Sequence, residues 1–220
     1  MPAVLFDFNG VLVDDEELHF EAFRAALAER GVVLGRERYY AELLGFDDAG
    51  LLEAVLPGVA PRELEEIASR KAAEYARRSA SEPRPFDGVL GLVRALYAAS
   101  VPMAVVSGAL GHEVRSALGR FGIADCFRCI VASEDVDRCK PDPAGYLEAL
   151  RRLGDLVRSA AECVAIEDSP AGIAAAKAAG MRAIGVAHTV PREQLAQADL
   201  VAASVADLDV RAVLAVLGEG

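Results

Sequence analysis

Short, continuously apolar runs recur along the chain and alternate with longer stretches of helical periodicity. A strand covered on both faces has no polar side, so these runs predict buried strands at residues 3–8, 103–106, 129–131, 164–166 and 183–186. The stretches beside them predict helices over about residues 87–99, 111–121, 143–154, 170–179 and 209–217. Alternating strands and helices of this kind predict an α/β fold with a Rossmann-like, doubly wound parallel sheet.

The segment after the first predicted strand has helical spacing and no convincing strand pattern. Pro61 occupies a suitable first helical position. Beyond it, apolar residues recur at helical spacing as Leu64, Ile67, Ala68, Ala72 and Tyr75. We therefore predict an all-helical cap, residues 15–84, inserted into a core made of residues 1–14 and 85–220. Hinges are expected near residues 13–16 and 82–86.

Polar residues stand at the ends of four predicted strands. In chain order they are Asp7 with Asn9, Ser107 with Gly108, Lys140, and Glu167 with Asp168. Ligands bind at the carboxyl ends of strands in open parallel sheets, so we expect these residues on one rim. The loop of Lys140 adds Asp135, Asp137 and Asp142 to the expected rim. Carboxylates suit Mg²⁺, a strand-end carboxylate can act as a nucleophile, and Ser107 and Lys140 can hold phosphoryl oxygens.

Each of these features alone also has a purely structural explanation. Asp7 can cap a strand, Ser107 with Gly108 can form an ordinary turn, and Lys140 can lie in a solvated loop. Ser169 and Pro170 can start a helix as its N-cap and first residue. The occurrence of all four features in order on four strand ends favours a functional site.

Composition narrows the class of protein and its partners. Hydrophobic residues make up 53% and charged residues 26%, which is a globular composition. A net charge of -11 disfavours nucleic acid as a partner and requires local positive groups for an anionic substrate. The first residues lack a signal-peptide pattern and no apolar run is long enough to span a membrane, so we expect a cytoplasmic protein with no membrane partner. Cys126 and Cys129 lack a second pair of zinc ligands, so the cysteines are expected to be buried or partly buried thiols.

Four motifs in order resemble those of the haloacid dehalogenase superfamily, in particular its β-phosphoglucomutase-like phosphatases with a helical cap. They lie at residues 7–14, 105–108, 140–143 and 167–173, within a resemblance that spans about residues 3–215. The resemblance implies that Asp7 is a nucleophile that becomes an aspartyl-phosphate. It also implies that Asp7, the main-chain carbonyl of Asn9 and Asp168 ligate Mg²⁺, with Glu167 as a supporting partner. Ser107, the Gly108 amide and Lys140 would hold the phosphoryl group.

Asn9 departs from the family pattern, in which a second aspartate protonates the leaving group and then activates water. An amide cannot donate and recover a proton, and loss of a general acid–base typically costs about 10²–10⁴ in rate. Asn9 is thus a natural variant with a substitute acid, a deliberate alteration, or the mark of a relative without turnover. Asp15 stands where the family usually has Ser or Thr, so we hypothesise that it takes part of the proton-transfer role. The alternative is that Asp15 only caps the helix beginning near Glu16.

The predicted cap carries further candidates. Residues 44–48 occupy the segment where sugar-phosphate mutases present an arginine, and the acids found here disfavour a second phosphate group. Lys71 falls where mutase-like caps present an active-site lysine, and its alternative is a side chain that snorkels to solvent. His19 matches the cap-helix histidine of that subgroup, and its alternative is a packed helix histidine.

These observations predict a monomeric, Mg²⁺-dependent phosphatase that acts on a small phosphorylated metabolite through an aspartyl-phosphate. Two alternatives remain open: a dehalogenase-like or phosphonatase-like hydrolase of the same superfamily, and a catalytically impaired phosphate-binding protein. A phosphorelay receiver would use a similar rim of acid, hydroxyl and lysine, but it needs no helical insert.

Overall fold

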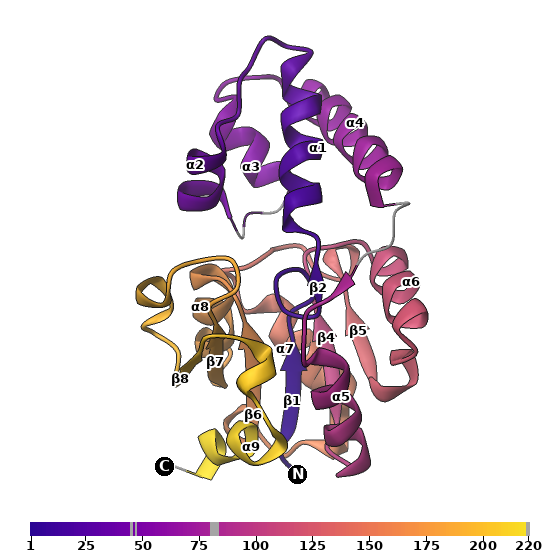
Figure 1. The fold of residues 1–220 in the computed structure, drawn as a ribbon, viewed down its shortest axis with the longest axis vertical. Coiled ribbons are helices and arrows are strands. Elements are labelled where there is room, and N and C mark those ends of the chain that lie inside the picture. The colour runs from indigo at the N-terminus through magenta and orange to yellow at the C-terminus, as the bar shows by residue number, and fades with distance from the viewer. Residues whose placement is uncertain (45, 47, 80–83, 219–220) are drawn as a thin grey trace. The chain divides into compact units, whose positions relative to one another are not determined.

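The computed structural model describes residues 1–44, 46, 48–79 and 84–218 (Figure 1). The chain divides into two compact units, one made of Met1–Val13 with Pro85–Gly220 and the other of Asp14–Arg84. Two short strands, β2 (Val13–Asp14) and β3 (Arg84–Pro85), pair where the chain passes between the units. Of the second predicted hinge, residues 82–86, residues 82 and 83 lie outside the described residues. The roles of core and cap stay predictions.

The first unit contains a six-stranded parallel sheet in the order β5-β4-β1-β6-β7-β8. Its strands are β1 (Ala3–Phe6), β4 (Met103–Val106), β5 (Cys129–Val131), β6 (Cys163–Glu167), β7 (Arg182–Val186) and β8 (Leu200–Ala202). The predicted parallel α/β sheet is confirmed. β8 was not predicted, because its three half-buried residues at the sheet edge give too short an apolar run.

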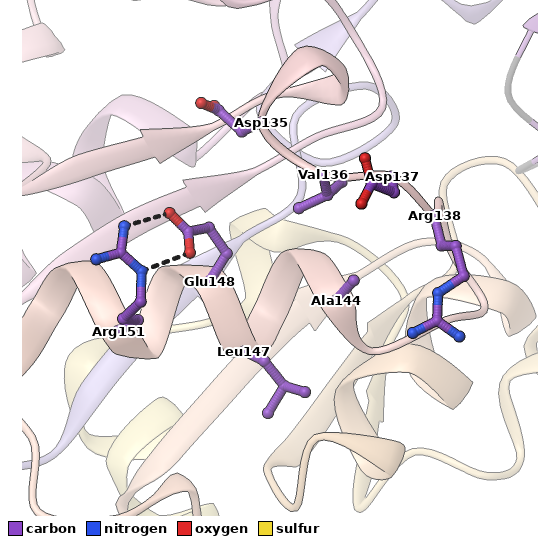
Figure 2. A pocket seen from close by; sticks show the side chains of 8 residues that line it. All are labelled: Asp135, Val136, Asp137, Arg138, Ala144, Leu147, Glu148 and Arg151. Carbon is purple, nitrogen blue, oxygen red and sulfur yellow. Dashed lines mark hydrogen bonds and ion pairs between the residues drawn. The ribbon is translucent and has the colours of Figure 1, made fainter.

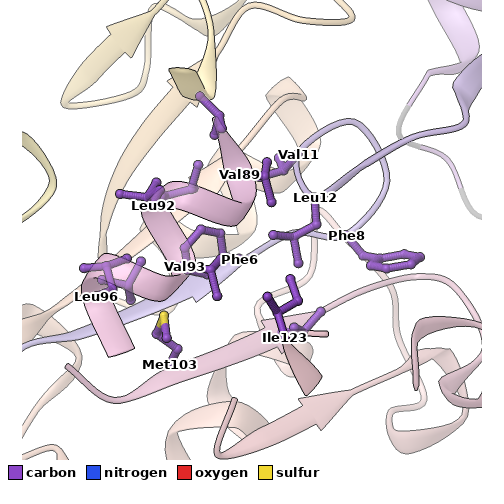
Figure 3. Close-up of a cluster of buried hydrophobic side chains, with 14 of the residues drawn as sticks. Phe6, Phe8, Val11, Leu12, Val89, Leu92, Val93, Leu96, Met103 and Ile123 are labelled. Atoms are coloured by element: carbon purple, nitrogen blue, oxygen red, sulfur yellow. The ribbon is translucent and has the colours of Figure 1, made fainter. Parts of the chain in front are cut away.

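Helices cover the sheet and bury its side chains. They are α5 (Val89–Ala98), α6 (Gly111–Phe121), α7 (Ala144–Leu153), α8 (Pro170–Ala178) and α9 (Val210–Gly218), each close to its predicted range. Short 3₁₀ segments lie at Ala124–Cys126, Ser133–Asp135, Gly154–Leu156, Ala160–Glu162, Arg192–Leu195 and Val205–Asp207. One apolar cluster joins α5, α6 and α9 to β1 and β4 through residues such as Phe6, Leu96 and Met103 (Figure 3). This packing holds the central strands rigidly, so their carboxyl ends form a fixed platform for a site.

The second unit is helical. It contains α1 (Glu16–Ala28), α2 (Arg36–Arg38), a π-helical turn (Tyr39–Leu43), α3 (Asp48–Val55) and α4 (Pro61–Ser79). Its core includes Phe20, Phe23, Leu27 and Ile67. The helix α4 begins at Pro61, as its position predicts. The prediction that Ala72 belongs to the apolar stripe is wrong: Ala72 is exposed, while Lys71 occupies the buried face one residue earlier.

Candidate active site

Three carboxylates meet at the carboxyl ends of β1 and β6. Phe6 pairs with Ile166 in the parallel register, and the Asp7 N–H donates to the Ile166 carbonyl at 3.0 Å. The strands therefore deliver Asp7 beside Glu167 and Asp168, and one oxygen of each of these three residues lies within 4.8 Å of the others. All three side chains are buried. We call Asp7, Glu167 and Asp168 the carboxylate cluster.

Lys140 contacts the carboxylate cluster from the loop after β5. Its Nζ contacts Asp7 Oδ1, lies 2.7 Å from Glu167 Oε1 and donates to the Val106 carbonyl at 3.1 Å. Tyr146 also donates to Glu167 Oε1. The other oxygen, Glu167 Oε2, is buried and has no hydrogen-bond partner among the described residues. Glu167 is thus anchored on one side, and its second oxygen is left as an unused acceptor.

Burial controls the charge state of this cluster. It raises the pKa of Glu167 to about 7, against the opposing charge of Lys140. Burial alone would lower the pKa of Lys140, but Asp7 and Glu167 outweigh it and hold that pKa above its usual value. Burial, together with Glu167, raises the pKa of Tyr146 well above its usual value. A charged lysine beside three buried carboxylates leaves an excess of negative charge, which suits a divalent cation with oxygen ligands.

The loop after β1 presses directly against Asp168. Gly10 has a φ of +77°, and a Cβ placed on it would lie 1.9 Å from Asp168 Oδ2. The same oxygen, Asp168 Oδ2, accepts a hydrogen bond from the Thr189 hydroxyl at 2.5 Å. Asn9 is half-buried in this loop and forms a bridge with Val13. Sequence reasoning missed Thr189, although its position just after β7 follows the strand-end rule that found the other residues.

Ser107 and Gly108 stand at the end of β4, next to β1 in the sheet. The Ser107 N–H donates to the Val131 carbonyl at 2.9 Å, and the Ser107 hydroxyl accepts from the Ala109 N–H at 2.9 Å. Ser107 is buried, whereas Gly108 is exposed. The pair is therefore both a tight turn and a polar strand end beside the carboxylate cluster.

The structural explanation for Ser169 and Pro170 also holds. The Ser169 hydroxyl accepts from the Gly172 N–H at 3.1 Å as the N-cap of α8, and Pro170 is the first residue of the helix. A Cβ on Gly172 would lie 1.9 Å from Glu167 Oε2, so the helix start packs against the buried carboxylate. The segment from Glu167 to Gly172 therefore both caps α8 and packs against the carboxylate cluster.

Of the three acidic residues expected on the rim beside Lys140, two form ion pairs with arginines, and none of the three belongs to the carboxylate cluster. Asp135 lies 2.6 Å from Arg152, and Asp142 lies 2.9 Å from Arg138. Asp137 instead lines a shallow hollow with Val136, Arg138, Ala144, Leu147, Glu148, Arg151 and Asp135 (Figure 2). From this loop, Lys140 forms ion pairs with two members of the carboxylate cluster.

The helical unit buries its own polar network. Lys71 Nζ lies 2.8 Å from Asp48 Oδ1 and 2.9 Å from His19 Nδ1, and it stands 4.6 Å from the ring centre of Phe23. Lys71 is 3% exposed, so the snorkelling alternative is wrong. His19 stacks on Tyr75 with 4.2 Å between ring centres, which agrees with a packed histidine. Gly45 and Asp47, from the segment expected to repel a second phosphate, lie outside the described residues, while Asp48 pairs with Lys71.

Asp15 belongs to the same network. It is 1% exposed, its Oδ2 accepts from the Tyr75 hydroxyl at 2.6 Å, and the same oxygen lies 3.5 Å from His19 Nε2. Asp15 occupies the N-cap position of α1 but makes no side-chain capping hydrogen bond. The alternative that Asp15 only caps this helix is therefore wrong.

The four cysteines are thiols, with Cys163 buried and Cys126, Cys129 and Cys139 half-buried. This confirms the expectation of buried or partly buried thiols. Burial raises the pKa of Cys129 and takes that of Cys163 to about 11, which makes both weak nucleophiles.

Among the described residues, no helix combines the length and apolar character needed to cross a bilayer.

The sequence profile of the haloacid dehalogenase-like hydrolases matches residues 4–186, and the chain belongs to this family. It is 34% identical over 217 residues to β-phosphoglucomutase of Bacillus subtilis (strain 168), covering 94% of this chain and 92% of the relative. It is 31% identical over 199 residues to validoxylamine A 7'-phosphate phosphatase of Streptomyces hygroscopicus subsp. limoneus, covering 89% of this chain and 90% of the relative.

Solved structures agree with this assignment. CbbY from Rhodobacter sphaeroides in complex with phosphate has a TM-score of 0.85 and 30% identity, with 97% of this chain and 99% of that chain covered. β-Phosphoglucomutase from Clostridium difficile has a TM-score of 0.89 over 100% of this chain and 98% of its own, and at 23% identity it shows the shared fold alone. The resemblance to the β-phosphoglucomutase-like subgroup is confirmed.

Proposed function

We propose that this protein is a Mg²⁺-dependent phosphatase that hydrolyses a small phosphorylated metabolite through an aspartyl-phosphate on Asp7. The observation that carries the proposal is the buried carboxylate cluster with Lys140 bound to two of its members. Relatives named for phosphatase activity support the reaction class. They include the validoxylamine phosphate phosphatase, a phosphorylated carbohydrates phosphatase of Thermotoga maritima and hexitol phosphatase B of Escherichia coli.

The donor set fits Mg²⁺. Asp7, Asp168 and the Asn9 carbonyl would hold the ion, because hard oxygen donors are what it prefers and the cluster carries excess negative charge. Glu167 is held by Lys140 and Tyr146 and supports the ligands beside it. When bound, Mg²⁺ supplies positive charge to the phosphoryl oxygens.

The remaining strand-end groups fit a phosphoryl group. Lys140 keeps its charge because its pKa is held high. Its three N–H groups face Asp7, Glu167 and the Val106 carbonyl, so it offers phosphoryl oxygens its positive charge, and it would exchange one of these partners to donate a hydrogen bond to them. The Ser107 hydroxyl accepts one hydrogen bond from Ala109 and can still donate its own proton. The exposed Gly108 amide adds a further donor. We assign these three groups to phosphoryl binding.

The proposed reaction has two displacements at phosphorus. A carboxylate oxygen of Asp7 attacks, the ester P–O bond breaks, and the leaving oxygen takes a proton to become an alcohol. Water then attacks the phosphorus of the aspartyl-phosphate, losing a proton as inorganic phosphate leaves and the Asp7 carboxylate is restored.

Proton transfer is the step for which Asn9 is unsuited. We assign part of this role to Asp15, a buried carboxylate within reach of two groups that exchange protons or hydrogen bonds, Tyr75 and His19. Residues 15–84 would act as the cap, in which His19 and Lys71 contact the substrate. Asp48 forms an ion pair with Lys71, and its negative charge would repel a second phosphate. A polar, hydroxyl-bearing substrate therefore suits these groups better.

Asn9 also favours a second candidate, a protein that binds a phosphorylated metabolite without turning it over. Hydrolysis of p-nitrophenyl phosphate and of a panel of sugar phosphates, with Mg²⁺ and with a chelator, separates the two. We expect turnover that needs Mg²⁺ and is lost in Asp7→Asn and Asp168→Ala. It should not be lost in Asp137→Asn, because Asp137 precedes Lys140 in the same loop but does not belong to the carboxylate cluster. Phosphate binding without turnover in the wild type, but with turnover in Asn9→Asp, would establish the second candidate.

A further inference from the structure

His188 connects the loop after β1 to the far edge of the sheet. It lies two residues beyond the end of β7, and its Nδ1 is 2.9 Å from the Gly10 carbonyl oxygen. On the opposite side of the ring, Nε2 accepts from the Val205 N–H at 3.1 Å and lies 3.2 Å from Ser204 Oγ. All of these residues belong to the first unit.

The partners of His188 fix its protonation state. A backbone N–H can only donate, so Nε2 must carry a lone pair toward Val205. A carbonyl can only accept, so Nδ1 must carry the hydrogen that reaches Gly10. The ring is therefore neutral and is the Nδ1–H tautomer. Phe86 stacks on it with 4.0 Å between ring centres and an angle of 19°, which holds the ring plane.

The position of the Gly10 carbonyl affects the neighbouring groups of the loop after β1. The loop is closed by its own hydrogen bonds, because the N–H groups of Leu12 and Val13 both donate to the Phe8 carbonyl at 2.8 and 3.0 Å. Gly10 lies so close to Asp168 that a Cβ would overlap the carboxylate. A displacement of Gly10 therefore moves the adjoining Asn9 carbonyl and the packing of Asp168 together.

Two consecutive residues thus each hold one partner of the contact between Gly10 and Asp168. His188 holds the Gly10 carbonyl, and Thr189 holds the Asp168 carboxylate through a hydrogen bond of 2.5 Å. Each of these two residues supplies one hydrogen-bond donor. His188 donates to a carbonyl and Thr189 donates to a carboxylate, and both residues belong to the segment after β7.

We propose that His188 is a positioning residue that fixes the Gly10 carbonyl and so sets the Asn9 carbonyl and Asp168 for metal binding. The inference rests on the proposed function, which assigns Mg²⁺ to these groups. His188 does not touch the substrate or the reacting atoms. Its effect is carried by the single hydrogen bond from Nδ1, and the bonds at Nε2 only anchor the ring.

Two variants separate the two sides of the ring. In His188→Asn the amide nitrogen stands near the position of Nδ1 and can still donate to Gly10, but nothing reaches Val205. In His188→Gln the longer side chain places its amide oxygen near the position of Nε2, where it can accept from Val205, and the Gly10 bond is lost. Each variant therefore removes the hydrogen bond on one side of the His188 ring, either to Val205 or to Gly10, and the two side chains differ little in size.

The test is the Mg²⁺ dissociation constant by titration calorimetry, with thermal unfolding of the metal-free proteins and kinetics beside it. We expect His188→Gln to raise the dissociation constant about 10- to 100-fold, as loss of a group that orients metal ligands typically does, while His188→Asn stays near the wild type. Equal dissociation constants in the two variants, or a loss that follows thermal unfolding alone, would overturn the inference. In the wild type, ¹⁵N shifts of the ring should report a protonated Nδ1, and a protonated Nε2 would also overturn it.

The same data separate this inference from the proposed function. If the wild type binds Mg²⁺ but hydrolyses no phosphomonoester, the proposed function fails while the comparison of dissociation constants still decides the role of His188. If the wild type binds no Mg²⁺, the inference fails together with the metal assignment.

Discussion

Lys140 Nζ lies 2.7 Å from Glu167 Oε1 and also contacts Asp7 Oδ1, so one ammonium is shared by two buried carboxylates from neighbouring strands. Such an arrangement is costly to assemble, because each buried charge must be stripped of water. Buried charges with strongly perturbed pKa values are frequent at functional sites. The contacts of Lys140 with Asp7 and Glu167 therefore affect both the stability of the protein and the proposed reaction.

Removing the charge of Lys140 should destabilise the protein and make it depend on Mg²⁺. Lys140→Met keeps an apolar stem but leaves buried carboxylates without their cation, which costs about 3–5 kcal/mol of unfolding free energy. Added Mg²⁺ should then stabilise the variant more than the wild type in urea unfolding. Lys177→Met, which removes an exposed pair with Asp199, is the matched control and should respond to Mg²⁺ as the wild type does. An equal response in Lys140→Met would argue against the electrostatic account.

Gly10 should tolerate no side chain for a reason beyond backbone strain. Gly10→Ala places a Cβ 1.9 Å from Asp168 Oδ2, whereas a Cβ on Gly122, which has a φ of +65°, would meet nothing within 4 Å. Both substitutions should lower the unfolding free energy by about 1–3 kcal/mol from the positive φ. Calorimetry should show that Mg²⁺ binding is lost only in Gly10→Ala. Normal binding in that variant would contradict the placement of the loop against the metal site.

Glu16 should make the unfolding free energy depend on pH. Burial raises its pKa above the ordinary value of 4.5, and Tyr39 donates a hydrogen bond to its carboxylate. Between the unfolded and folded pKa values the folded state binds more protons, so the unfolding free energy contributed by Glu16 falls as pH rises through that window. Glu16→Gln should remove this fall and be more stable than the wild type at neutral pH. Urea unfolding from pH 4 upward measures it, and an unchanged slope would refute the assignment.

The proton-transfer role of Asp15 can be measured with a four-member cycle of wild type, Asn9→Asp, Asp15→Ser and the double variant. If Asp15 compensates for Asn9, Asp15→Ser alone should lose most of the turnover, about 10²-fold or more. In the Asn9→Asp background the same change should cost little, because the family carboxyl is restored. Equal losses in both backgrounds would mean that Asp15 serves only the network with Tyr75 and His19.

The fold was largely predictable because its signals are local. Short continuous apolar runs such as residues 164–166, bounded by polar residues, favour a buried strand, and Pro61 marks a helix start by its fixed φ. β8 escaped because an edge strand of three half-buried residues buries too little apolar surface to leave a pattern. Ala72 was misplaced because it was assigned by its apolar character, although Lys71 lies four residues from both Ile67 and Tyr75 and so shares their helix face.

The site was predictable where a residue follows a strand directly, as with Asp7, Glu167 and Asp168. Residues farther along a loop were predicted unevenly, because a loop has no periodicity. Lys140 was predicted on the rim and contacts the carboxylate cluster, but Asp135 pairs with Arg152, and Thr189, which was missed, donates to Asp168. The hydrogen bond between Asp15 and Tyr75 joins residues 60 positions apart, and nothing local in the sequence specifies it.

The central claim is that Asp7 becomes phosphorylated in a Mg²⁺-dependent reaction. With p-nitrophenyl phosphate the leaving group needs no proton, whereas the attacking water still needs a base that Asn9 cannot supply, so the aspartyl-phosphate should accumulate during turnover of this substrate. The decisive measurement is acid quench of the reacting enzyme followed by mass spectrometry of the peptide that contains Asp7. The account predicts an added phosphoryl group on Asp7 with Mg²⁺, none with a chelator and none in Asp7→Asn. Release of phosphate from the substrate with an unmodified Asp7 peptide, or with the phosphoryl group on another residue, would contradict it.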